Sequence, residues 1–122
     1  MADFYHHLGQ ALLGLQMGGD ALDALENVII LAPDDSSSYK HYGLAAGQLG
    51  QQEVAEMYLR NALRIRPNDV DALHNLGVCL MQQQRSGDAF PYFARAVKLN
   101  PADEGKRKSL EALHNSLDES SA

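Results

Sequence analysis

The chain has few of the residues and runs that define secreted, metal-binding or membrane proteins. Its single cysteine, Cys79, excludes an internal disulfide framework and any zinc site built from several cysteines. No stretch approaches the roughly 18 uninterrupted apolar residues that a transmembrane helix needs. The first residues, MADFYHH, have neither the basic start nor the apolar run of a secretory signal. We therefore expect a cytosolic protein.

The chain also has fewer positively than negatively charged residues. It contains ten Lys and Arg and sixteen Asp and Glu, and the formal net charge of −6 repels nucleic acids and anionic membrane surfaces. The one basic run, Lys106, Arg107 and Lys108, fits a solvated helix face better than a phosphate site. Apolar residues make up 45% and charged residues 21% of the 122, which is the ordinary balance of one globular domain.

The main feature of the sequence is an internal repeat with a period of 34 residues. When the chain is shifted by this period, four columns are identical in three copies, and other columns keep their size or polarity. The identical columns are Gly9, Gly43 and Gly77; Ala21, Ala55 and Ala89; Pro33, Pro67 and Pro101; and Asp35, Asp69 and Asp103. The interpretation of the whole fold must therefore start from this repeat.

Each copy has room for two helices. Apolar residues recur at helical spacing in both halves of a copy, as Tyr39, Tyr42 and Ala46 do in the first half of the second one. The proline ends the second helix, because it has no N–H and disfavours helix in the residue before it. The following Asp can cap the next helix. The glycine and the alanine column indicate close approach of neighbouring helices, where a larger side chain would push the pair apart.

These residues resemble the tetratricopeptide repeat, whose signature is W-x2-L-G-x2-Y, then A-x3-F, then P. The signature positions hold Tyr5, Leu8, Gly9, Leu12, Ala21, Leu25 and Pro33; Tyr39, Tyr42, Gly43, Ala46, Ala55, Leu59 and Pro67; and Leu73, Leu76, Gly77, Leu80, Ala89, Phe93 and Pro101. The tryptophan position departs from the pattern, and the turn glycine found at Gly50 is replaced by Gln16 and Gln84.

The resemblance implies an all-α, right-handed α-solenoid of three helix-turn-helix repeats, at residues 2–35, 36–69 and 70–103, in a single domain. The segment 104–117 has an apolar stripe and a polar face, as the capping helix of an open stack requires. Leu110, Leu113 and Leu117 form the stripe, and Lys106, Arg107, Lys108 and Asn115 are expected on the solvated side. We expect the tail, 118–122, to be disordered.

In the resembled family the first helices line a concave face that binds peptides or segments of partner proteins and carries no catalysis. The residues agree, because the sequence has no Gly-rich phosphate loop, no HExxH and no nucleophile beside a paired base. The resemblance thus implies a non-enzymatic adaptor, assembly factor or secretion-type chaperone that uses no cofactor.

Helical geometry selects the residues of the first helices that point away from the stack. The candidate groove residues are His6, Gln10, Leu13, Lys40, His41, Leu44, Gln48, Asp71, His74, Asn75, Val78 and Met81. Leu13, Leu44, Val78 and Met81 are expected to be exposed, and such apolar groups in a groove favour a partner with hydrophobic anchors. The alternative is that tight curvature buries these four residues against one another.

Some family members hold a C-terminal carboxylate with Lys and Asn in the first repeat and basic residues in the third. The equivalent places here hold His6 and Gln10, and then Asp71 and Asn75. This departure disfavours the tail of a chaperone as the ligand.

The histidines do not predict a metal site. His6 and His7 diverge by about 100° around their helix, and His6 lies roughly 20 Å from His74 if each layer adds 8–10 Å. His7 and His41 share a column but supply two ligands at most, whereas stable zinc sites have three or more. A pH-dependent partner interaction is the better hypothesis. Cys79 stands in a column of alanines and is expected to be a small packing residue.

Two alternatives remain open. The protein could self-associate through its first repeat, where Tyr5, Leu8, Leu12 and Leu15 would form an uncapped apolar edge. It could also be a recognition domain cut from a larger enzyme, such as a glycosyltransferase.

Overall fold

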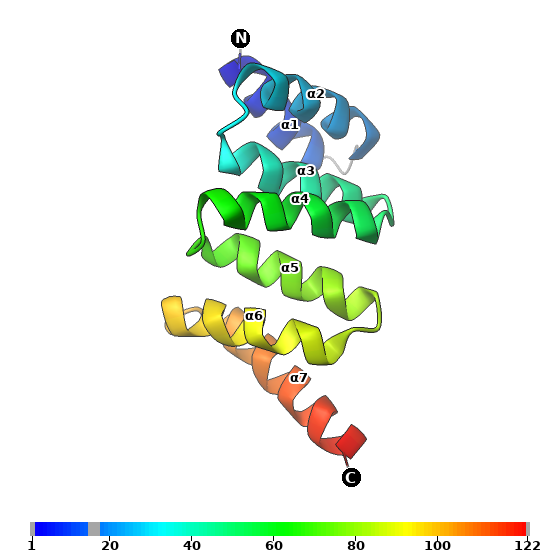
Figure 1. Ribbon diagram of the computed structural model, residues 1–122, viewed down its shortest axis with the longest axis vertical. Coiled ribbons are helices and arrows are strands. Elements are labelled where there is room, and N and C mark those ends of the chain that lie inside the picture. The colour runs from blue at the N-terminus through cyan, green and yellow to red at the C-terminus, as the bar shows by residue number, and fades with distance from the viewer. Residues whose placement is uncertain (1, 15–17, 122) are drawn as a thin grey trace. The chain divides into compact units, whose positions relative to one another are not determined.

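The computed structural model describes the backbone of residues 2–14 and 18–121, and among them the side chains of residues 7–12, 14 and 19–118. Over these residues the chain is all-α (Figure 1). Its seven helices are α1 (Ala2–Gly14), α2 (Gly18–Leu31), α3 (Ser36–Gln48), α4 (Gln52–Ile65), α5 (Val70–Gln82), α6 (Ser86–Leu99) and α7 (Glu104–Ser121). The all-α fold expected from the sequence is confirmed.

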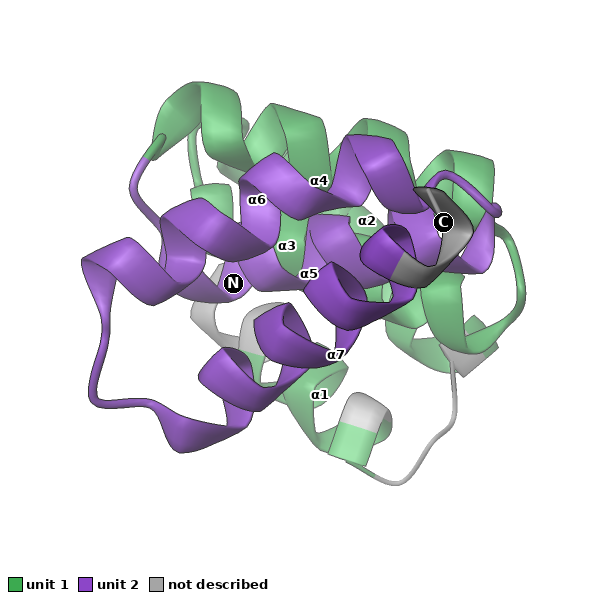
Figure 2. Cartoon of the chain, turned by 90° about the horizontal axis from the view of Figure 1, so that it is seen from below, with its two compact units in different colours: residues 1–67 green, residues 68–122 purple. Residues whose placement is uncertain are grey.

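The chain divides into two compact units, residues 1–67 and 68–122 (Figure 2). The first unit contains the hairpins α1–α2 and α3–α4, and the second contains the hairpin α5–α6 with α7. The physical reason is that each repeat of a helical array contacts mainly its neighbours in sequence. The division therefore falls at the turn between two repeats, directly after Pro67.

The repeated prolines and aspartates end and begin the helices as expected. Helix α2 ends at Leu31, two residues before Pro33, and α4 and α6 end at the same distance before their own prolines. Each repeated Asp then accepts a backbone N–H from the helix that follows. The bonds are Ser37 N to Asp35 Oδ1 at 3.1 Å, Ala72 N to Asp69 Oδ1 at 3.2 Å, and Lys106 N to Asp103 Oδ1 at 3.1 Å.

The two helices of each hairpin meet at the repeated glycine. A Cβ atom placed on Gly77 would lie 2.9 Å from the Phe93 ring, and one on Gly43 would lie 2.7 Å from Leu59 Cγ. The first hairpin has the same contact between Gly9 and Leu25. The three large side chains are almost fully buried. The glycines are therefore required by the close approach of the second helix, as predicted.

The first repeat is less well covered than the third. Leu8 is 39% exposed, whereas Leu76, at the same place in the third repeat, is fully buried. Leu8 is one of the four residues that the sequence places on an uncapped apolar edge of the first repeat.

Helix α7 has the predicted apolar stripe, but it is longer than expected. Leu113 is buried, and Leu110 and Leu117 are half-buried. The helix continues to Ser121, and Ala122 lies outside the described residues. The disordered tail at 118–122 stays a prediction. Within this last part of α7, His114 Nε2 lies 3.3 Å from Asp118 Oδ2, four residues later.

Replacing Gly77 with Ala should lower the free energy of unfolding by about 1–3 kcal/mol, because the new Cβ must displace the buried Phe93 ring. The measurement is urea unfolding followed by circular dichroism. Gly87→Ala is the matched control, since an added Cβ there meets nothing within 4 Å. Equal effects of the two changes would contradict this account of the glycine column.

Gln84 occupies the turn position that Gly50 fills in the second repeat, and both have positive φ, +62° and +80°. A side chain at positive φ destabilises the folded state by about 1–2 kcal/mol. Glycine avoids this strain, but it also makes the unfolded chain more flexible, which cancels part of the gain in stability. We expect Gln84→Gly to raise the unfolding free energy by about 0.5–1 kcal/mol, and Gly50→Gln to lower it by a similar amount. A Gln84→Gly variant that is less stable than the wild type would refute this strain.

Candidate partner-binding surface

In the first unit, α1 and α3 bring two predicted groove residues together. The amide nitrogen of Gln10 lies 3.5 Å from Nε2 of His41, and Nδ1 of His41 lies 3.4 Å from the Ser37 hydroxyl oxygen. Each imidazole nitrogen donates or accepts in these contacts according to the tautomer of the ring. Gln10, Ser37 and His41 therefore form a polar patch that spans α1 and α3.

The remaining predicted residues of this unit lie along the same helix face or outside the described side chains. Lys40 and Leu44 are half-buried, and Gln48 is exposed. Lys40, Leu44 and Gln48 are each four residues apart, so they lie near one another along one face of α3. The side chains of His6 and Leu13 lie outside the described residues.

In the second unit, α5 carries Asp71, His74, Asn75, Val78 and Met81. Asp71 is exposed and the next three are half-buried, while Met81 is 38% exposed. Met81 is therefore the one predicted apolar groove residue that the described side chains show as exposed. Leu44 in the first unit is only half-buried as well. Of the four apolar residues that the sequence expects to be exposed, Met81 is exposed, Leu44 and Val78 are half-buried, and the Leu13 side chain lies outside the described residues.

Lys106 belongs to this surface, although the sequence places it on the solvated side of α7. Its side chain is only 16% exposed, and its ammonium lies 2.9 Å from Asp103 Oδ2 and 3.4 Å from Asp71 Oδ1. The hydrogen bond from Lys106 to Asp103 raises the pKa of Lys106 and lowers that of Asp103. Lys106 therefore stays protonated and cannot serve as a nucleophile.

The repeat contains a pattern from which the inward position of Lys106 could have been predicted. The same column holds Ser38 and Ala72 in the second and third repeats, and both are fully buried. Ser38 also donates to the capping Asp of its own repeat, Asp35, at 3.0 Å. Reading α7 as a fourth first helix would have predicted that Lys106 points inward to the capping Asp103.

His74 lies under the cluster that Asp71, Asp103 and Lys106 form. Its ring is edge-on to Phe93 at 5.1 Å between centroids, and its Nδ1 atom is buried without a hydrogen-bond partner among the described residues. Burial lowers the pKa of His74, and the Lys106 cation lowers it further, while the two carboxylates oppose this shift in part. The ring is therefore held in its neutral form.

The described residues contain no group of three or more His, Cys, Asp or Glu that could hold a metal ion. Within the same residues, every helix is too short or too polar to cross a bilayer. Cys79, which the sequence predicts as a packing residue, is buried on α5, and the Gln83 amide donates to its sulfur at 3.5 Å.

The lowered pKa of His74 predicts a pH-dependent stability. The folded protein disfavours the protonated ring, whereas the unfolded chain binds a proton near its ordinary pKa of about 6.5. The contribution of the neutral ring is thus present above about pH 6.5 and is lost as the pH falls through the folded pKa. We expect the free energy of unfolding, measured with urea between about pH 5 and pH 8, to fall more steeply at low pH for the wild type than for His74→Leu. Parallel profiles would exclude His74 as the source.

Solved structures with the same fold are tetratricopeptide repeat domains. The first such domain of Spaghetti (RPAP3), bound to the HSP90 peptide SRMEEVD, is 17% identical, covers 96% of this chain and 93% of its own, and superposes with a TM-score of 0.91. The first domain of human RPAP3 is 18% identical, with 98% and 94% covered and a TM-score of 0.92. The tetratricopeptide repeat domain of Sgt2 from Aspergillus fumigatus is also 18% identical, with 98% and 81% covered and a TM-score of 0.92.

At such low identity these structures establish the fold and nothing further. No curated protein sequence matches the chain. The family model of the tetratricopeptide repeat matches residues 6–70 and, in a second register, residues 43–104. These matches span most of the chain and agree with three helix hairpins followed by a capping helix. The chain therefore belongs to the tetratricopeptide repeat family.

Proposed function

We propose that the chain is a non-enzymatic module that binds a segment of a partner protein through its first helices. The observation that carries the proposal is that packing residues and surface residues occupy different positions of these helices. The repeated positions, such as Gly43 and Gly77, are buried in the packing between helices. Gln10, Gln48 and Met81 lie at other positions and are exposed on the surface. Polar groups beside an exposed apolar side chain suit a peptide with hydrophobic anchors.

The peptide bound by the related domain of Spaghetti supports this kind of ligand but not that ligand itself. Such a peptide, SRMEEVD, is rich in carboxylates. In the present chain Lys106 is already paired with Asp103 and Asp71, so the cluster has one more negative than positive charge. We propose instead a segment without acidic residues at this place, held by apolar contacts with Met81 and hydrogen bonds to polar side chains.

The finer role that we propose is that of a cytosolic adaptor, assembly factor or secretion-type chaperone. The repeat limits 2–35, 36–69 and 70–103 are part of the same proposal. Self-association through the first repeat is a second candidate, and the 39% exposure of Leu8 favours it. An apolar side chain on the uncovered side of α1 is a contact that a second protein surface could bury.

Two methionine variants test the proposed surface. Met81 on α5 is 38% exposed, and Met57 on α4, a second helix, is 56% exposed. Each is changed to Glu, and both proteins are used with the wild type as baits for affinity capture and mass spectrometry. We expect Met81→Glu to lose the captured partner by tenfold or more (about 1.4 kcal/mol), because a charge would be buried in the contact. Met57→Glu should retain the partner.

Circular dichroism and urea unfolding of both variants serve as the control for folding. Since both methionines are exposed, neither change should reduce stability by more than about 0.5 kcal/mol. If Met81→Glu and Met57→Glu capture the same partners as the wild type, the first helices are not the binding surface and the proposal fails.

A further inference from the structure

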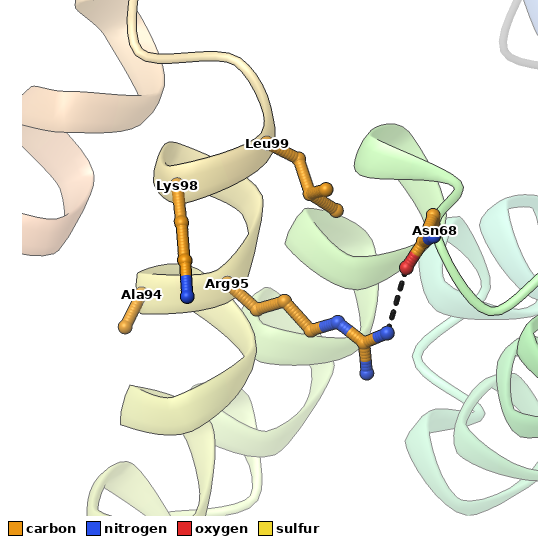
Figure 3. Close-up of a pocket in the computed structure, with 5 residues that line it drawn as sticks. All are labelled: Asn68, Ala94, Arg95, Lys98 and Leu99. Atoms are coloured by element: carbon orange, nitrogen blue, oxygen red, sulfur yellow. Dashed lines mark hydrogen bonds between the residues drawn. The ribbon is translucent and has the colours of Figure 1, made fainter.

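A pocket of about 560 Å³ lies on α6, away from the first helices (Figure 3). It is lined by Asn68, Ala94, Arg95, Lys98 and Leu99. Arg95 Nη2 donates a hydrogen bond of 2.7 Å to Asn68 Oδ1, and both Arg95 and Leu99 extend from α6 towards Asn68 in Figure 3. The bond holds the guanidinium at the pocket but uses only one of its several N–H donors.

The ion pairs of the described residues leave the charge of this pocket unbalanced. Arg95 and Lys98 lie one helical turn apart, and the neutral amide of Asn68 is the partner that the structure gives to Arg95. Among the described residues, none of the ion pairs involves either cation. Leu99 adds an exposed apolar side chain to the same pocket. The pocket therefore suits carboxylates that lie beside an apolar group.

The outer face of α2 has the complementary pattern. Asp23 and Glu26 are exposed and three residues apart, the same spacing that separates Arg95 from Lys98. Ile30, one turn further along α2, is 71% exposed. In the part of the chain that the structure describes, neither carboxylate belongs to an ion pair.

The distribution of charge along the chain indicates which surfaces of two copies can meet. Residues 1–39 contain six Asp and Glu and no Lys or Arg, whereas residues 40–122 contain ten of each sign. The entire net charge of −6 therefore belongs to the first repeat. Two first repeats repel each other, and the first repeat of one copy is attracted to a positive site on another.

We propose that the α6 pocket binds the outer face of α2 from a second copy of this chain. Asp23 and Glu26 then face Arg95 and Lys98, and Ile30 lies beside Leu99. Because the contact joins two different surfaces, a dimer leaves one α2 face and one pocket free, and larger assemblies follow. Exposed ion pairs are individually weak and are screened by salt, so the assembly is concentration-dependent and salt-sensitive. The contact does not depend on the proposed function of the first helices.

Analytical ultracentrifugation of the full chain tests this contact across roughly two decades of protein concentration, at about 50 mM and about 500 mM NaCl. We expect the average mass of the wild type to rise with concentration beyond the dimer at low salt, and to fall towards the monomer at high salt. A mass that stays at the monomer throughout would overturn the proposal.

Charge reversals then identify the surfaces. The pocket variant is Arg95→Glu with Lys98→Glu, and the face variant is Asp23→Lys with Glu26→Lys. Each alone should weaken association by tenfold or more, because like charges would meet. An equimolar mixture of the two should associate again, since the reversed pocket and the reversed face are complementary. A mixture that remains monomeric would overturn the proposed pairing.

A charge-matched control separates the local contact from general repulsion. Arg107→Glu with Lys108→Glu makes the same change in net charge on α7, at two exposed positions outside both surfaces. It should associate like the wild type, and a loss equal to that of the pocket variant would count against the pocket. Association that survives both reversals but is lost in Leu8→Glu would place the contact at the edge of the first repeat and overturn the inference.

Discussion

The fold depends on the contact between a glycine on the first helix of each hairpin and a large side chain on the second. Without a Cβ at Gly43 or Gly77, the second helix comes near enough to bury Leu59 or Phe93 almost completely. Burial of one such side chain contributes about 1.5–3 kcal/mol, and the same contact occurs once in every hairpin. The capping aspartates add fixed start points, so each hairpin is specified by a few residues.

This constraint also explains where function can lie. Positions used for the glycine contact and for the caps cannot vary without loss of packing, whereas the other faces of the helices are free to carry charge. The chain uses this freedom unevenly. The first repeat carries acidic side chains without a single Lys or Arg, while the α6 pocket presents Arg95 and Lys98 with no carboxylate partner in the described structure.

The repeat sequence was sufficient to predict the helices, their ends and the glycine contacts, because each depends on short-range backbone chemistry or on one neighbouring helix. The candidate surface was predicted less well. Leu44 and Val78 were expected to be exposed but are half-buried. Lys106 pairs with Asp71 and Asp103 instead of facing solvent. A helical wheel gives the direction of each side chain but not the group that a neighbouring helix places in front of it.

The sequence by itself determined the family, the three hairpins and the acidic first repeat, since periodicity, prolines and glycines act locally and charge is additive. Only the tertiary structure decided which polar residues are paired and which are left with an unbalanced charge. Arg95 contacts Asn68, which lies 27 residues earlier in the chain, and Lys106 on α7 contacts Asp71 on α5. Such pairs depend on the distance between helices that are remote in sequence, and that distance is set by packing rather than by any local pattern.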